Sequence, residues 1–267
     1  MYFGLSEDQV FFQDNVKKFL DAEAPLDVIK KIADGNNQNI KDELHQGIIN
    51  LGINNILIPE ENGGLGLDLL FAVAISQSLG ACVAPLPYTG PYVLAPTAIK
   101  HGANQEQKNR FFEGMSNNSI NFAVGFSEYF GSRDSSGLTF SKNKVSGKTL
   151  FVIDHEYASH VMICNNTGKI GIVCLNSQGI DAIELTTVDK TRTYKEMHFN
   201  NTPVEILENS ENSSTAINQS IDAGRIILAA DSIGASQSML DKAVEYSKER
   251  KQFNRVIGSF QAVKHKC

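Results

Sequence analysis

The sequence lacks the features that mark membrane, secreted and nucleic-acid-binding proteins. No apolar run approaches the roughly 20 residues needed to span a bilayer. The first residues, Met1 to Val10, lack the charged and apolar segments of a secretory signal. The formal net charge of −6 gives no basic field for nucleic acid. We therefore expect a cytoplasmic protein with no membrane insertion and no nucleic-acid partner.

Cysteine and histidine are too few and too scattered to suggest a disulfide framework or a metal site. The four cysteines, Cys82, Cys164, Cys174 and Cys267, include no Cys-x-x-Cys pair, which favours reduced thiols. The six histidines show no metal-ligand spacing. The sequence therefore predicts no metal site.

The residues that are abundant indicate a soluble globular protein. Of the 267 residues, 42% are apolar, and both charge signs are mixed along the chain, which argues against disorder. A chain of this length can bury a substantial core and suits two or three domains.

Helical patterns fill residues 1–118, which we predict to be an N-terminal α-helical domain. Ser6 with Gln9 begins the first helix as a capping box, and Asn104 caps a later helix with Gln107 at its third position. Pro25 is expected to end the first helix. Further helices are expected over Asp42–Leu51, Leu69–Leu79 and Val93–His101 and after Asn104, with Pro85, Pro87 and Pro91 excluding regular structure before Val93.

The apolar period changes over residues 119–210. Short alternating or apolar runs, from Ile120–Phe126 to Met197–Phe199, recur between clusters of Asn, Gly and Asp. This spacing predicts a central domain that is a compact antiparallel β barrel or sandwich.

Residues 211–267 return to the helical period and are expected to begin a C-terminal helical bundle. The expected apolar stripe comprises Ile217, Ile221, Ile226, Ala230, Ile233, Leu240 and Val244. Small residues on other faces indicate a helix inside a bundle. The last stretch, Glu245–His265, is expected to end this helix, turn over Asn254–Gly258 and start a second helix capped by Ser259. The fold class is therefore α+β and multidomain.

Several blocks spread over the whole chain occur in an order that a known family shares. They are Pro59–Leu67, His101–Gly114, Phe126–Asp134, Val145–Ala158, Asp222–Tyr246 and Arg250–Lys264. Their residues and order resemble those of the acyl-CoA dehydrogenase family of flavoproteins. This resemblance implies an N-terminal helical domain, a central β domain and a C-terminal four-helix bundle, of which most lies beyond this sequence.

The resemblance also implies the residues that bind FAD and substrate. The cofactor-binding set would be Phe126, Ser127, Ser132, Phe151, Val152, Ile153, Arg250, Phe253 and Gln261. In this set Phe151 would form an apolar wall for the flavin, and backbone amides near Phe126–Ser127 and Phe151–Ile153 would be donors. Arg250 and a serine would contact the diphosphate, with Arg250 and Gln261 reaching the FAD of a neighbouring subunit. Arg225 and Ser132 would bind the acyl-CoA substrate.

This sequence departs from the family pattern at several of these positions. Tyr129 stands where a proline is expected, Arg133 interrupts Gly-Ser-Asp, Ile153 replaces a threonine, and Asn254 replaces a glycine. No catalytic residue is identified in the chain. The family's base would lie beyond Cys267, and its alternative position is occupied by Gly224.

The resemblance implies an oxidoreductase acting on CH–CH bonds, by α,β-dehydrogenation of an acyl-CoA thioester. A carboxylate would remove the α-proton, a hydride would pass to FAD, and an electron-transfer flavoprotein would accept the electrons. Such enzymes act in fatty-acid, steroid side-chain or related acyl-CoA catabolism as homo- or hetero-oligomers, dimers or tetramers. Four alternatives stay open: a non-catalytic or half-site subunit of a hetero-oligomer, a truncated inactive fragment, an oxidase or flavin monooxygenase, and a structural protein without flavin.

Overall fold

Helices build the first part of the molecule. The computed structural model describes residues 4–35, 37–208 and 213–267. The helices of this part are α1 (Glu7–Glu23), α2 (Leu26–Ala33), α3 (Gln38–Asn50), α4 (Leu69–Cys82), α5 (Ala95–Gly102) and α6 (Gln105–Ser116), with the 3-10 turns η1 (Ile53–Asn55) and η2 (Glu60–Asn62) and the π-helical turn η3 (Gly90–Leu94). The prediction of an all-helical N-terminal part is confirmed, whereas its boundary at residue 118 stays a prediction.

Both expected helix starts are confirmed by their hydrogen bonds. Ser6 Oγ accepts from the Gln9 amide at 3.2 Å, and Gln9 Oε1 accepts from the Ser6 amide at 2.9 Å. Asn104 and Gln107 exchange the same pair of bonds at 2.8 and 3.3 Å. Each exchange satisfies amides that the first helical turn leaves without partners.

One expectation about proline is confirmed and another was wrong. Helix α1 ends at Glu23, just before Pro25 as expected, and Pro25 then precedes the first turn of α2. Pro91 lies in the first turn of η3, in a stretch expected to have no regular structure. Proline is tolerated at these positions because the first turn of a helix uses none of its own amide donors.

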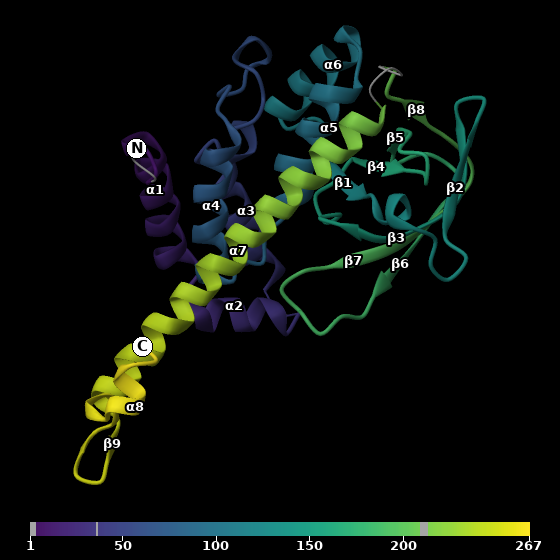
Figure 1. Ribbon diagram of the computed structural model, residues 1–267. Helices are drawn as coiled ribbons and strands as arrows, with labels where there is room; N and C mark the ends of the chain where they lie inside the picture. The colour runs from purple at the N-terminus through teal and green to yellow at the C-terminus, as the bar shows by residue number, and fades with distance from the viewer. Residues whose placement is uncertain (1–3, 36, 209–212) are drawn as a thin grey trace.

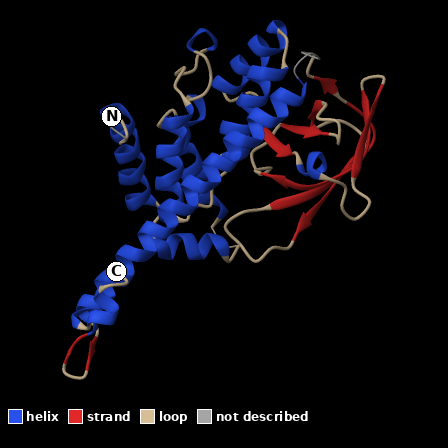
Figure 2. Cartoon of the chain, viewed as in Figure 1, coloured by secondary structure: helices blue, strands red, loops and turns tan. Residues whose placement is uncertain are grey.

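The central part is one open, mixed sheet rather than the antiparallel barrel or sandwich expected. Its strands are β1 (Phe122–Gly125), β2 (Gly137–Ser141), β3 (Lys144–Ile153), β4 (His160–Cys164), β5 (Ile170–Cys174), β6 (Ile180–Leu185), β7 (Tyr194–Pro203) and β8 (Glu205–Ile206), with the 3-10 turn η4 (Ser127–Phe130) after β1. The order is β6-β7-β3-β1-β4-β5-β8, with β2 paired to β3. Among the described residues the sheet does not close on itself (Figure 2).

The sheet is mixed because β1 runs antiparallel to one neighbour and parallel to the other. It pairs antiparallel with β3 and parallel with β4, with Val124 opposite Ile153 and Met162 respectively. The alternation of apolar residues predicts each strand but not its neighbours, so the parallel pair could not be predicted.

A single long helix, α7 (Ser213–Glu249), crosses the molecule in front of α4 and beside the sheet (Figure 1). Its buried side includes Ala216, Ile217, Ser220, Ala223, Ile227 and Ala230. The expected stripe was therefore partly wrong, because Ile226, Ile233 and Leu240 are exposed on other faces. The predicted boundary between residues 210 and 211 lies outside the described residues.

The chain after α7 folds back as a small hairpin. Strands β9 (Lys251–Gln252) and β10 (Arg255–Val256) are followed by η6 (Ile257–Ser259) and α8 (Gln261–Lys264). The turn places Asn254 at φ 60°, a region that asparagine tolerates, which explains how it replaces the family's glycine. The predicted Ser259 cap was wrong: its hydroxyl donates to Val256 O at 2.7 Å, and Phe260 precedes α8.

Candidate functional site

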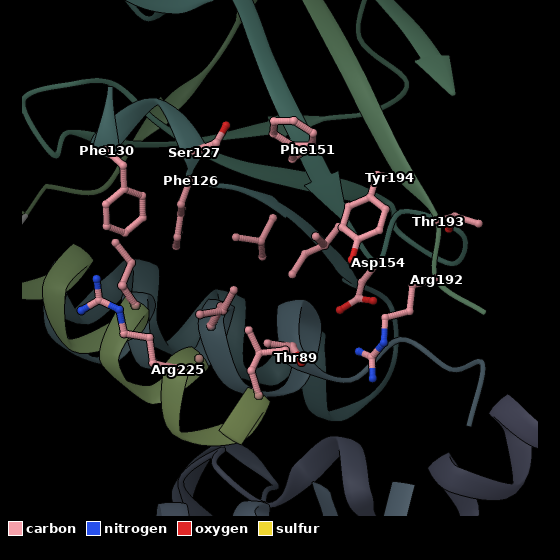
Figure 3. A pocket seen from close by; sticks show the side chains of 16 residues that line it. Thr89, Phe126, Ser127, Phe130, Phe151, Asp154, Arg192, Thr193, Tyr194 and Arg225 are labelled. Carbon is pink, nitrogen blue, oxygen red and sulfur yellow. The ribbon is translucent and has the colours of Figure 1, made fainter. Parts of the chain in front are cut away.

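One largely apolar cavity of about 350 Å³ lies where the sheet, η3 and α7 meet (Figure 3). It is lined by Thr89, Leu94, Val124, Phe126, Ser127, Phe130, Phe151, Ile153, Asp154, Arg192, Thr193, Tyr194, Ile221, Gly224, Arg225 and Leu228. Residues far apart in sequence thus form one concave site, the usual form of a small-molecule pocket.

A bulge in β3 turns the Phe151 ring towards this cavity. The register with β7 shifts between Thr149 and Val152, and Phe151 has φ +54° with 43% of its surface exposed. A positive φ is costly for a bulky residue, so neighbouring contacts must hold the bulge.

Glu128 of η4 makes those contacts. The side chain is 2% exposed and accepts hydrogen bonds from the Leu150 amide at 2.9 Å and from the Thr149 hydroxyl. The Ser127 hydroxyl lies 3.0 Å from Glu128 Oε1 and 2.7 Å from Leu150 O, and donates to one of them at a time. These bonds join the two segments that present Phe126 and Phe151 to the cavity.

Helix α7 forms the opposite wall and one end of the cavity. Arg225 is exposed there, donates to Asp222 at 2.8 Å, and holds its guanidinium 5.6 Å from the centre of the Phe130 ring. At Gly224 an added Cβ would lie 2.7 Å from Leu94 Cδ2. The space at Gly224 is therefore closed to a glutamate side chain unless Leu94 moves.

The other end of the cavity is polar. Asp154, which directly follows β3, accepts a hydrogen bond from the Gly90 amide at 2.7 Å. Burial raises the pKa of Asp154 to about 6, although that hydrogen bond and the charge of Arg192 oppose the shift. Arg192 donates to Asp231 of α7 at 2.8 Å. Burial likewise raises the pKa of Tyr194.

The structure brings together part of the predicted site. Phe126, Ser127, Phe151, Ile153 and Arg225 all line the cavity. The remaining predicted residues lie elsewhere: Val152 has its side chain buried, Ser132 lies in an exposed loop against Ser136, and Arg250, Phe253 and Gln261 belong to the segment that follows α7, at the end of that helix distant from the sheet (Figure 1).

The polar end was not predicted. Asp154 was noticed only as part of a sequence block, and its position directly after a strand was a usable signal. Arg192 lies in the connection between β6 and β7, and reaches the cavity because Leu185 pairs with Tyr194. That pairing is not visible in the local sequence.

Comparisons with known proteins give one consistent result. Residues 6–119 match the family profile described as acyl-CoA dehydrogenase, N-terminal domain, and residues 214–267 match the profile described as acyl-CoA dehydrogenase, C-terminal domain. Together the two matches cover more than half of the chain.

Curated relatives agree with these profiles. The chain is 26% identical to the probable acyl-CoA dehydrogenase YngJ of Bacillus subtilis, over all of this chain and 75% of that protein. It is 23% identical to CarC, a subunit of the caffeyl-CoA reductase-Etf complex of Acetobacterium woodii, over 98% of this chain and 74% of that protein. The chain spans between about half and three quarters of the length of the curated relatives it matches.

Solved structures share the fold. Butyryl-CoA dehydrogenase from Megasphaera elsdenii matches with a TM-score of 0.83 at 20% identity, over 100% of this chain and 75% of that one. The ChsE4-ChsE5 complex from Mycobacterium tuberculosis matches with a TM-score of 0.82 at 22% identity, over 99% and 73%.

Proposed function

The chain belongs to the acyl-CoA dehydrogenase family, and on that basis we propose that it is an FAD-dependent dehydrogenase of acyl-CoA thioesters. The observation that carries the proposal is the cavity shared by Phe151 of β3, Phe126 between β1 and η4, and Arg225 of α7. An apolar aromatic wall and an exposed cation are what a flavin ring and a CoA phosphate require.

The cavity residues fit the ring of a flavin better than they fit its phosphates. Phe151, Val124 and Ile153 offer an apolar surface that excludes water, and Ser127 lies at its edge. FAD, when bound, supplies the hydride acceptor. Ile153 has no hydroxyl, so only its backbone can donate a hydrogen bond to the cofactor. Arg250 and Gln261 are proposed to serve the FAD of a neighbouring subunit.

The chain's own residues position the substrate in this proposal. Arg225 attracts the CoA phosphates to the open end, while Leu94, Ile221 and Leu228 enclose the acyl chain against the sheet. Gly224 cannot supply the base, because glycine has no side chain. The α-proton acceptor in this proposal is therefore not the residue at position 224.

The partners follow from the same reasoning. We propose acyl-CoA as substrate, an electron-transfer flavoprotein as acceptor, a cytoplasmic location, and a homo- or hetero-oligomer. No helix among the described residues has the length and apolar character needed to cross a membrane.

Several apolar side chains of α7 are exposed and suit a second chain of the same family: Ile226, Ile233, Met239, Leu240 and Tyr246. Light scattering that gives the mass of one chain would contradict the oligomer.

The visible absorption spectrum tests the activity. The purified protein should show a flavin band that bleaches on anaerobic addition of one member of an acyl-CoA panel. Phe151→Ala should lose FAD on gel filtration, whereas Phe11→Ala, an exposed phenylalanine on α1, should retain it. A protein that takes up no FAD contradicts the proposal. A flavin band that no acyl-CoA bleaches contradicts dehydrogenation by this chain but leaves cofactor binding intact.

A further inference from the structure

The two ends of the cavity differ in chemistry, and this difference bears on the acyl group. Phe130 and Arg225 stand at one end, and Asp154, Arg192 and Tyr194 stand at the other (Figure 3). The side chains between them are mostly apolar. If the CoA phosphates meet exposed Arg225, as in the proposed function on which this inference rests, the distal part of the acyl group faces Asp154.

At the polar end, the charge of Arg192 is taken up by carboxylates other than Asp154. Arg192 already pairs with Asp231 at 2.8 Å and lies 4.0 Å from Asp189, so its positive charge is balanced without Asp154. Asp154 accepts from the backbone at Gly90, with a weaker backbone contribution from Tyr88. A carboxylate can accept about four hydrogen bonds, so Asp154 retains capacity for another donor.

The remaining acceptor capacity of Asp154 separates three kinds of acyl terminus. A methyl end would place hydrocarbon against the Asp154 carboxylate. The carboxylate would then lose water molecules that donate hydrogen bonds to it, and the ligand would provide no donor in their place. A carboxylate end would face the charge of Asp154, and Arg192 is already paired with Asp231, so this repulsion is not offset. A hydroxyl end would donate to Asp154 and leave the other contacts unchanged.

A second cavity continues the polar region beyond this end. It measures about 480 Å³ and shares Arg192 and Thr193 with the first cavity. Its other lining residues include Gln38, Lys41, Glu156, Thr186, Thr187 and Lys190. The acyl site therefore runs into polar surroundings instead of ending in an apolar floor.

We propose that Asp154 selects acyl groups that carry a hydroxyl on their distal part. Asp154 is thus a specificity-determining residue, with the apolar walls binding the carbons near the thioester.

A matched set of three ligands of equal chain length tests this proposal: hexanoyl-CoA, 6-hydroxyhexanoyl-CoA and adipoyl-CoA. Dissociation constants are measured by titration calorimetry on the purified protein in the presence of FAD. The hydroxy ligand should bind about ten-fold or more tightly than hexanoyl-CoA, as one hydrogen bond to a charged group provides. Adipoyl-CoA should bind most weakly.

Two variants test whether Asp154 causes the preference for the hydroxyl ligand. Asp154→Asn keeps the side-chain shape and an acceptor for Gly90, and should reduce the hydroxyl preference to within about three-fold by removing the charge. Asp241→Asn, on an exposed part of α7 where Asp241 accepts from Gln237, should leave the preference unchanged.

The outcomes separate this inference from the proposed function. Equal binding of hexanoyl-CoA and 6-hydroxyhexanoyl-CoA to the wild type overturns the role of Asp154 while acyl-CoA binding stands, and so does a preference that survives in Asp154→Asn. If no acyl-CoA binds, the proposed function itself fails and this inference falls with it.

Discussion

At the scale of single residues, Glu128 is the side chain on which the shape of the cavity depends most directly. It is buried, and it accepts from Thr149 and Leu150 on either side of the β3 bulge. A phenylalanine in a regular strand would need no such support, whereas the backbone of Phe151 is held at φ +54°. The bulge and its support therefore form one structural unit.

Replacing Glu128 by alanine should lower the free energy of unfolding by about 2–4 kcal/mol, because two buried donors lose their acceptor. Glu128→Gln retains an acceptor for the Leu150 amide and an amide that can donate to Thr149, so it should lose much less. Urea unfolding measures the stability, and gel filtration in FAD measures whether Phe151 still supports the flavin. Equal losses in the two variants would contradict this expectation, because glutamine keeps the volume and one acceptor and differs from glutamate chiefly in its charge.

Residues that belong to a sequence motif could be predicted, and those that depend on strand pairing could not. Phe151 was identified from its block, although the bulge that presents it was not foreseen. Arg192 reaches the cavity only because β6 and β7 pair with Leu185 opposite Tyr194. Ser132 was predicted from the same kind of motif as Phe151, yet its loop turns away and bonds Ser136.

At the scale of elements, the crossing of α4 and α7 fixes the wall of the cavity. Gly80 of α4 lies against Asp231, and Gly234 of α7 lies against Gln77, with no room for a Cβ at either position. Ser76 also donates to Ile227 O at 2.9 Å. The backbones therefore approach closely over this stretch.

Gly234→Ala should lower stability by about 1–3 kcal/mol, since the added methyl would overlap the Gln77 carbonyl. The sign of the change in stability identifies its cause. In an ordinary helix position alanine is favoured over glycine by about 1 kcal/mol, so a loss of stability indicates the contact with α4. Ser236→Ala, on the exposed side of α7, is the matched control and should be neutral. Thermal unfolding provides the measurement, and a stabilised Gly234→Ala would mean that the helices are not in contact there.

Element types were predicted more successfully than their arrangement. Local capping residues mark α1 and α6 in the sequence, but nothing local marks the parallel pairing of β1 with β4. The stripe of α7 was only partly correct because apolar residues occupy more than one of its faces, and sequence alone does not show which face meets α4.

At the scale of the whole molecule, a polar cluster joins the helices to the sheet. His45 of α3 stacks on Tyr157, in the connection after β3, with ring centres 3.9 Å apart, and its Nε2 lies 3.0 Å from the Tyr92 hydroxyl. Tyr157 in turn donates to Asp42 at 2.7 Å. Lys41 and Glu156 form an ion pair beside it.

This cluster should weaken in acid. Burial lowers the pKa of His45 to about 4 from 6.5, so the folded state disfavours protonation. The stability that neutral His45 contributes is complete above pH 6.5 and is lost as the pH falls towards 4, by at most about 3 kcal/mol. Comparing urea unfolding of wild type and His45→Gln at pH 7 and pH 5 isolates this residue: the wild type should lose more stability. A difference between the two proteins that does not change with pH would contradict the assignment.

The packing of α7 on α4 also affects how the protein is made in the cell. Ala223 and Ile227 of α7 belong to the same core as Leu20, Leu44 and Ile75 of the N-terminal helices. Ser76 and Ile227, which are bonded, are separated by 151 positions in the chain. At typical synthesis rates α7 follows α4 out of the ribosome by roughly 8 to 30 s. During that interval the apolar surface of the first helices has no covering helix, so we expect the nascent chain to be prone to aggregation and to be bound by chaperones.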